Sequence, residues 1–134
     1  MKQVQLRTFE KLSFNPGTEY INKCCEFCDL MLEKIKPKIF ERLNVALKNV
    51  VIEQEDWGWL LEFQRGEFFY NLSISYQGLD KDCAHNFGLI IEIEKLRRGF
   101  VFNRRVEATE KYENFTKTVK SIADELDFEF FEEK

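Results

Sequence analysis

The apolar positions in the first third of the chain recur at steps of three and four residues. This spacing is typical of one face of an α-helix, and the residues that follow it are Tyr20, Cys24, Phe27, Cys28, Met31, Ile35, Ile39, Phe40, Leu43 and Leu47. The preceding NPGT, residues 15–18, has the turn and capping residues of a helix start. Pro37 interrupts the pattern, because proline removes a backbone hydrogen bond and clashes with the preceding turn. We therefore expect a kinked helix, or two helices in series, over residues 18–48.

The middle of the chain alternates apolar and polar residues, which is the period of a β-strand with one buried face. The clearest strand is residues 68–77, whose apolar side consists of Phe68, Tyr70, Leu72, Ile74 and Tyr76. Further strands are predicted at residues 50–54, 57–64, 87–94 and 100–103. A turn at 65–67, a loop at 78–86 and a turn at 95–99 separate them. We expect one face of this sheet to be buried and the other to be at least partly wet.

The strongest helical period lies near the C-terminus. Apolar residues step by four and three positions through Ala108, Tyr112, Phe115, Val119, Ile122 and Leu126, which predicts an amphipathic helix. Residues 127–134, DFEFFEEK, are expected to form a short edge strand or an acidic tail. The order of helix, strands and helix predicts a single α+β domain over residues 1–134. Its core would be an antiparallel meander of four or five strands, flanked by the N-terminal kinked helix and the C-terminal helix.

Composition narrows the class of protein. The 134 residues are 44% hydrophobic and 33% charged, which indicates one globular domain. No segment has the apolar core of a signal peptide or the ~20 apolar residues of a membrane span, so we expect a cytoplasmic protein with no membrane contact. The net charge of −4 argues against general nucleic-acid binding and suits a basic partner.

The four cysteines raise the question of a metal site. Cys25 and Cys28 form a C-x-x-C pair, and Cys83 with His85 could complete a tetrahedral zinc site. However, Cys24 and Cys28 also fit the apolar face of the predicted helix, where thiols behave as small hydrophobic groups. We therefore expect core cysteines, no metal and no cofactor. His85, the only histidine, is expected to be a solvated loop residue.

The segment GLIIEIEKLRRGF, residues 88–100, carries the sharpest enzymatic hypothesis. Glu92 and Glu94 lie two residues apart on a predicted strand and therefore share a face. Together with Asp80, Asp82 and Lys95 they resemble the PD-(D/E)xK nuclease family, which implies a Mg²⁺-dependent nuclease. The sequence departs from that motif because Glu94 occupies the position of its lysine and Lys95 points to the opposite face. The aspartates also lie in a predicted loop.

The plainer interpretation of this strand is structural. Ile91 and Ile93 would face the core while the two glutamates face water, as is usual in antiparallel sheets. The following basic group, Lys95, Arg97, Arg98, Arg104 and Arg105, brackets the sequence GFVFN. Cations interleaved with phenylalanines can bind single-stranded nucleic acid through phosphates and bases. A solvated basic turn is the simpler alternative.

Two segments combine acidic and aromatic residues, a composition suited to recognition of a basic protein. They are EQEDWGW, residues 53–59, and DELDFEFFEE, residues 124–133. The candidate partner-binding residues are Glu53, Glu55, Asp56, Trp57, Phe128, Glu129, Phe131 and Glu132. The alternative is that the aromatics lie in the core beside solubilising acids.

No convergent catalytic set emerges, and the sequence has no phosphate loop, dinucleotide fingerprint or nucleophile elbow. In size, acidity and α+β organisation the chain resembles the small bacterial immunity proteins of toxin–immunity systems, including those of contact-dependent growth inhibition. This resemblance implies a non-enzymatic protein that binds one-to-one to a basic toxin domain of the nuclease type. The alternatives are a nucleic-acid-binding or nuclease domain that uses Glu92, Glu94, Lys95, Arg97 and Arg98, and a subunit of a larger assembly.

Overall fold

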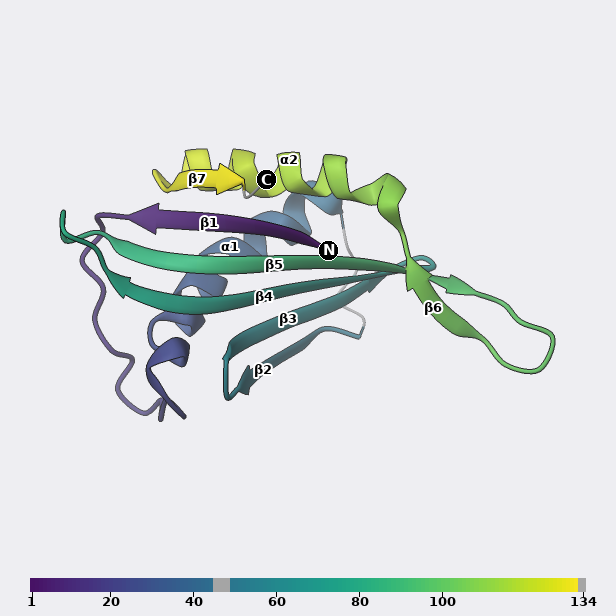
Figure 1. Cartoon of the computed structure of the whole chain (residues 1–134), viewed down its shortest axis with the longest axis horizontal. Coiled ribbons are helices and arrows are strands. Elements are labelled where there is room, and N and C mark those ends of the chain that lie inside the picture. Colours follow the sequence, from purple (N-terminus) through teal and green to yellow (C-terminus); the bar gives the residue numbers. More distant parts are fainter. Residues whose placement is uncertain (45–48, 133–134) are drawn as a thin grey trace.

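A computed structural model describes residues 1–44 and 49–132, which form one antiparallel sheet with two α-helices on the same side of it (Figure 1). The strands are β1 (Lys2–Thr8), β2 (Val51–Glu55), β3 (Gly58–Arg65), β4 (Phe68–Leu79), β5 (His85–Arg97), β6 (Arg104–Glu107) and β7 (Glu129–Glu132). The helices are α1 (Cys28–Leu43) and α2 (Tyr112–Glu125), and short 3-10 helices cover Lys23–Cys25 and Thr109–Lys111. The predicted α+β class with an antiparallel sheet is confirmed.

The sheet is larger than the predicted four or five strands. It has seven strands in the order β2-β3-β4-β5-β1-β7, and β6 pairs with β5 beyond this path. The meander from β2 to β5 agrees with the sequence. The N-terminal segment then inserts as β1 between β5 and β7, so the two ends of the chain lie side by side in the sheet (Figure 1).

The core lies between the helices and one face of the sheet. The predicted alternation is confirmed, because Leu72, Ile74, Ile91 and Ile93 are all buried. Aromatic rings tie α2 to this face: Phe63 stacks on Tyr70 at 5.0 Å between ring centroids, and Phe115 of α2 lies 5.0 Å from Tyr70. Burial of apolar area is the main stabilising contribution to such a fold.

The N-terminal helix is shorter than predicted. It begins at Cys28 rather than at residue 18, although Pro37 lies inside it as expected. Met31, Ile35 and Ile39 are buried as the periodicity indicated. The predicted positions Tyr20, Cys24 and Phe27 precede the helix, because residue 27 adopts a left-handed conformation with φ of 63° and the chain before it is irregular. The predicted end of the helix, including Leu47, lies outside the described residues.

Three further differences concern strands. Residues 2–8, to which the sequence interpretation assigned no element, form β1, and their alternation buries Val4 and Leu6. Residues 100–103 are not a strand but the projecting end of the β5–β6 hairpin, and pairing resumes only at Arg104. The C-terminal segment is an edge strand, which is one of the two predicted outcomes. No helix of the described chain has the length and apolarity needed to cross a membrane.

Candidate functional site on the open face of the sheet

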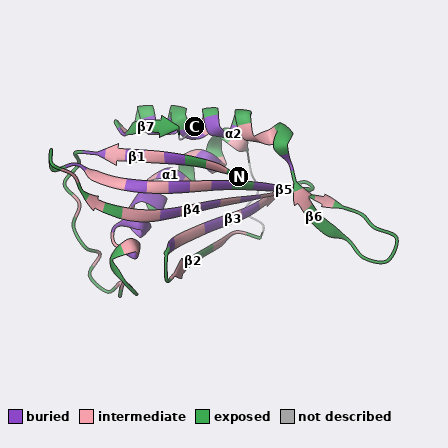
Figure 2. Cartoon of the chain, viewed as in Figure 1, coloured by how far each residue is buried: buried purple, intermediate pink, exposed green. Residues whose placement is uncertain are grey.

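One face of the sheet carries none of the helices in the described part of the chain, and we call it the open face. Both helices pack on the other side, so side chains at alternate strand positions point away from them (Figure 1). The open face comprises Val51, Glu53, Glu55, Leu60, Glu62, Gln64, Phe69, Asn71, Ser73, Ser75, Asn86, Gly88, Ile90, Glu92, Glu94, Leu96, Arg105, Glu107, Gln3, Gln5, Arg7, Glu129 and Phe131. None of these residues is buried, whereas their neighbours along β3, β4 and β5 mostly are (Figure 2).

A pocket of about 180 Å³ lies on the open face where small side chains meet. Its lining includes Ser73, Ser75 and Gly88, the apolar Ile90 and Trp57, and the polar Gln77. There is room for a hollow because Ser73, Ser75 and Gly88 carry little or no side chain on the adjacent strands β4 and β5. Apolar walls with a few polar groups are typical of a site that accepts an apolar anchor.

The position of Trp57 follows from the β2–β3 turn. Gly58, which comes next, has φ of 151°, and a Cβ there would meet the Ile74 carbonyl oxygen at 2.1 Å. Only glycine allows this approach of the turn to β4. The turn therefore places the Trp57 ring, which is 41% exposed, beside the pocket.

The open face is acidic. Strand register places seven carboxylates on it, those of Glu53, Glu55, Glu62, Glu92, Glu94, Glu107 and Glu129. Among the described residues its basic side chains are those of Arg7 and Arg105, and both are engaged by carboxylates of the same molecule, as the N-terminal ammonium is by Glu107. Arg105 lies 3.7 Å from the centroid of the Phe69 ring and 3.5 Å from a carboxylate oxygen of Glu62. The remaining negative charge is available to a basic ligand.

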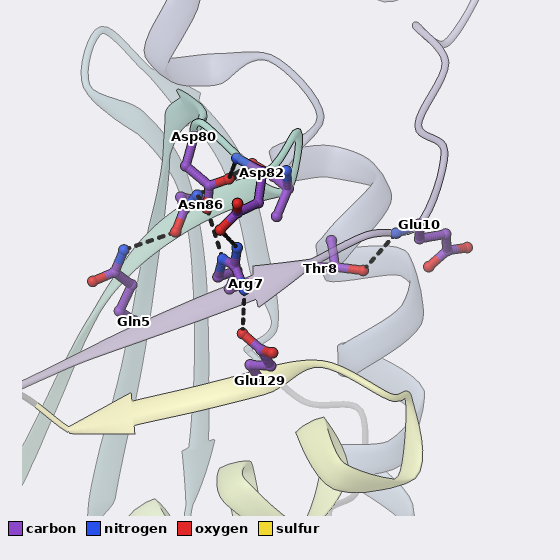
Figure 3. Close-up of polar contacts among 9 residues, drawn as sticks. Gln5, Arg7, Thr8, Glu10, Asp80, Asp82, Asn86 and Glu129 are labelled. Atoms are coloured by element: carbon purple, nitrogen blue, oxygen red, sulfur yellow. Dashed lines mark hydrogen bonds and ion pairs between the residues drawn. The ribbon is translucent and has the colours of Figure 1, made fainter.

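Arg7 joins three parts of the chain at one end of this face (Figure 3). Its guanidinium donates to Asp80 at 2.6 Å, to Glu129 at 2.8 Å and to Asp82 at 3.1 Å. Asn86 also donates to Asp80, at 2.9 Å. These hydrogen bonds, led by that of Arg7, hold the pKa of Asp80 well below its usual range. The group connects β1, β7 and the β4–β5 loop, and we call it the Arg7 cluster.

The predicted partner-binding residues fall into two groups at opposite edges of the sheet. Glu53, Glu55, Asp56 and Trp57 lie on β2 and its turn, while Glu129, Phe131 and Glu132 lie on β7. Five strand spacings separate these edges, which is roughly 24 Å.

Strand pairing connects the two groups across the open face. Ser75 pairs with Gly88, Gly88 pairs with Gln5, and Gln5 pairs with Phe131. Trp57 lines the pocket at the Ser75 end of this row. The fold therefore places the side chains of Trp57 and Phe131 at opposite ends of one surface.

Two of the predicted contacts do not belong to this surface. Phe128 is 3% exposed and packs in the core, so its side chain is not a surface contact. Phe128 lies just before β7, and its backbone N–H donates to the Ala123 carbonyl at 2.8 Å. This hydrogen bond holds the turn that directs the Phe128 side chain into the core. Glu132 pairs with Val4 on the covered side of the edge strand and lies 3.6 Å from Lys2.

The residues of the nuclease hypothesis are not brought together. Asp80 is held by Arg7, near the start of β5, and strand rise places it roughly 20 Å from Glu92. Lys95 points to the face opposite Glu94 and lies over the Phe68 ring. Glu92 and Glu94 instead line a shallow pocket with Glu107 and Tyr112. The structure thus agrees with the plain interpretation of this strand, with Ile91 and Ile93 in the core.

The cysteines are only partly where the sequence placed them. Cys25 and Cys28 are buried, Cys24 is half-buried and Cys83 is exposed. The prediction that Cys24 packs in the core is therefore wrong, and Cys25 takes that place. Burial raises the pKa of both buried thiols, which keeps them protonated and disfavours their use as metal ligands.

The remaining predictions concern a metal site and the position of His85. Within residues 1–44 and 49–132, no three His, Cys, Asp or Glu side chains are grouped so as to hold a metal ion. His85 is not a solvated loop residue, because it begins β5 and its Nδ1 lies 2.7 Å from the Tyr76 hydroxyl. Burial lowers the pKa of His85.

Apart from Trp57, the pocket residues were not identified from the sequence as functional. Ser73 and Ser75 were expected on the polar side of the clearest strand, but a pocket requires the neighbouring strand to present a small residue beside them. Gly88 supplies it, and a Cβ there would meet the Gln77 amide nitrogen at 2.6 Å. A glycine inside an otherwise apolar strand was the signal that could have marked this position.

Known proteins provide no further guide to the function. The chain matches no protein-family model, and no curated protein or solved structure is similar to it at a significant level. The function is therefore inferred from the geometry and chemistry of the open face.

Proposed function

We propose that this chain is a non-enzymatic binding protein whose open face docks a basic protein. The observation that carries the proposal is an uncovered acidic sheet face with a 180 Å³ pocket beside Trp57. Aromatic anchors in pockets provide much of the affinity of protein interfaces, and surrounding charges provide steering and specificity. A pocket with an aromatic neighbour and the surrounding carboxylates are both present on the open face.

Charge favours a protein over a nucleic acid at this face. The seven open-face carboxylates would repel phosphates, whereas Lys and Arg side chains of a protein would be attracted to them. The pocket is also shallow and small compared with the ~300–1,000 Å³ of typical small-molecule sites. A convex apolar side chain from a basic protein surface matches both properties.

The resemblance to immunity proteins suggests which basic protein this is. We infer a toxin domain of the nuclease type, whose phosphate-binding cleft carries the positive charge that nucleic-acid substrates require. An acidic sheet face could cover such a cleft one-to-one and exclude the substrate. A cytoplasmic location and a bacterial source belong to the same proposal.

The test compares two charge reversals of equal size. The partner is purified from the native host with the wild-type chain as bait, and its association rate is measured by interferometry at several salt concentrations. Reversal of Glu53, Glu55 and Asp56 to lysine should slow association by about 10–1000-fold at low salt. The control reverses Glu33, Glu41 and Glu110, three exposed residues away from the open face, and should have a much smaller effect.

Two results would contradict the proposal. Equal slowing by both triple variants would show that net charge, not the open face, governs association. Cleavage of plasmid or RNA in Mg²⁺ or Mn²⁺ that disappears in Glu92→Ala would show that the chain is an enzyme. Reversal of Arg97 and Arg98 should leave binding to the basic partner nearly unchanged, because these residues lie on the hairpin outside the open face.

A further inference from the structure

The hairpin between β5 and β6 presents apolar residues in an unusual position. Phe100, Val101 and Phe102 are 107%, 84% and 71% exposed, and the hairpin extends away from the rest of the molecule (Figure 1, Figure 2). Gly99 allows the tight end of the hairpin, because a Cβ there would meet the Phe102 carbonyl oxygen at 2.2 Å. Three consecutive exposed apolar residues on a projecting element indicate a contact site.

The hairpin is also the basic part of an acidic chain. Residues 95–105 contain five of the 20 Lys and Arg residues and none of the 24 Asp and Glu residues. The rest of the chain therefore holds 15 basic and 24 acidic residues, a net charge of −9. Opposite charges are thus segregated between the hairpin and the body.

The positions of the hairpin arginines do not stabilise the fold of a single molecule. Arg97 and Arg104 are directly paired across the two strands, and like charges in such positions repel one another. Neither makes an ion pair with any residue in the part of the chain that the structure describes, and Arg98 reaches only Glu67, at 3.9 Å. An acidic surface would relieve the repulsion between Arg97 and Arg104.

We propose that the hairpin docks on the open face of a second copy of this chain. In this contact a phenylalanine of the hairpin end enters the pocket beside Trp57, and the hairpin arginines meet the acidic residues around it. The inference uses the same face as the proposed function, but it does not require a foreign basic protein. The second copy is the occupant because its open face offers both the negative charge and the pocket.

The pocket has a suitable size and surroundings. A cavity of about 150 Å³ holds a benzene molecule, so the 180 Å³ pocket can accept one phenyl ring. Glu53 lies two strands from the pocket residue Ser73, which is roughly 10 Å. Arg98 lies two residues from Phe100, and Arg104 lies two residues from Phe102. With either phenylalanine in the pocket, an extended arginine side chain can therefore reach toward Glu53.

This contact joins two different surfaces of the chain. It is therefore heterologous, and successive copies can form a closed ring or a chain of subunits. The open face is covered in every copy whose pocket is filled. A basic partner must then displace the hairpin, so self-association and partner binding compete.

The test uses two variants, each of which disables one surface. Phe100→Ser with Phe102→Ser removes the hairpin anchors, and Trp57→Ala with Glu53→Lys and Glu55→Lys removes the pocket wall and two acids. In sedimentation velocity the wild type should associate with rising concentration and dissociate with added salt. Each variant alone should associate at least about 30-fold more weakly, as expected when an anchor residue is lost.

The decisive measurement is the mixture of the two variants. The first retains a functional open face and the second a functional hairpin, so an equimolar mixture should form a one-to-one complex of near wild-type affinity. A control with Ile21→Ser and Leu79→Ser, which replaces comparably exposed apolar residues elsewhere, should associate like the wild type. Melting curves of all variants check that the fold is retained.

Several outcomes overturn the inference. They are a wild type that stays monomeric at high concentration, a mixture that does not associate, and hairpin-dependent binding to anionic phosphatidylserine vesicles or oligo-dT by a monomeric wild type. The last would assign the hairpin to a lipid surface or to single-stranded nucleic acid. Loss of self-association with retained, Glu53-dependent binding of a basic partner would contradict only this inference and leave the proposed function intact.

Discussion

The two faces of the sheet are built from the same strands but have different roles. On β3 and β5, Leu61 and Ile91 are fully buried under the helices, while their neighbours Leu60 and Ile90 lie on the open face and remain partly exposed (Figure 2). The covered face contributes stability through apolar burial. The open face has apolar and acidic residues that no helix covers, which is the expected state of a docking surface before its partner binds.

The two faces also differ in how charge is treated. Among the described residues, the core between the helices and the covered face buries one charged side chain, that of Asp29 on α1, which accepts a hydrogen bond from the Tyr20 hydroxyl at 2.8 Å. The open face gathers carboxylates and neutralises its cations internally. Residues on the covered face should therefore control folding, and residues on the open face should control binding.

The largest expected difference is between two neighbouring isoleucines of β5. Ile91→Ala should lower the free energy of unfolding by about 2–5 kcal/mol, because it opens a cavity in the core. Ile90→Ala should cost about 1 kcal/mol or less, since its side chain is already partly in water. Both changes replace isoleucine by alanine in the same strand, so the loss of strand propensity is the same in both. The difference between their free energies of unfolding, measured by urea denaturation, therefore reports the burial of one face under the helices. Equal losses would contradict the division into two faces.

A smaller, pH-dependent contribution to the free energy of unfolding is expected from the Arg7 cluster. The pKa of Asp80 is lowered in the folded state, so its contribution to stability is fully present above its unfolded pKa of about 4. That contribution should disappear as the pH falls through the lower, folded-state pKa. Asp80→Asn keeps an oxygen for the N–H groups of Asp82 and Ala84 but loses the charge that faces Arg7.

Urea titrations at pH 7 and pH 2 measure this effect. At pH 7 the wild type should be more stable than Asp80→Asn, by less than the loss in Ile91→Ala, and the gap should narrow toward pH 2. A gap that is independent of pH would show that the carboxylate charge is not what stabilises the cluster. Asp82→Asn, at a more exposed carboxylate with a longer contact to Arg7, is the matched comparison.

A still smaller effect on folding is expected at the hairpin. Phe100→Ser with Phe102→Ser should change the free energy of unfolding by no more than about 0.5 kcal/mol, because both side chains are already exposed to solvent. Urea denaturation at low protein concentration, where copies do not associate, is the measurement. A large loss would mean that the hairpin end packs against its own molecule, contrary to the separation of folding and binding residues.

No effect is expected from metal removal. Cys25 and Cys28 pack as neutral thiols in the core and Cys83 is exposed in a separate loop, so a chelator should leave the melting temperature unchanged. Elemental analysis of the purified protein is the second measurement. Stoichiometric zinc, or a large loss of melting temperature on chelation, would contradict the assignment of these cysteines to the core.

Much of the covered face could be predicted from the sequence. The alternation through Tyr70, Leu72 and Ile74 identified buried positions, and so did the helical period through Phe115 and Val119. These predictions succeed because burial of one face imposes a local period on each element, and that period is visible without its neighbours. The acidic and aromatic character of two surface segments was equally visible.

Only part of the candidate site could be predicted from the sequence, because its arrangement depends on contacts between distant segments. Trp57 and Phe131 were identified as candidates, but their position at two ends of one surface depends on the pairing of β1 between β5 and β7. Phe128, from the same acidic segment, is turned into the core instead. Composition marks a segment as suitable for binding, but the turn before β7 decides which of its aromatic residues reach the surface.

The sequence by itself determined the α+β class, the faces of the central strands and helix α2, because periodicity is a property of a short segment. Only the tertiary structure decided that residues 2–8 join the sheet, that Arg7 meets Asp80, and that Ser73, Ser75 and Gly88 form a pocket beside Trp57. Each of these depends on contacts between residues far apart in the chain. Such contacts form because the whole core must close at once, and no local pattern specifies them.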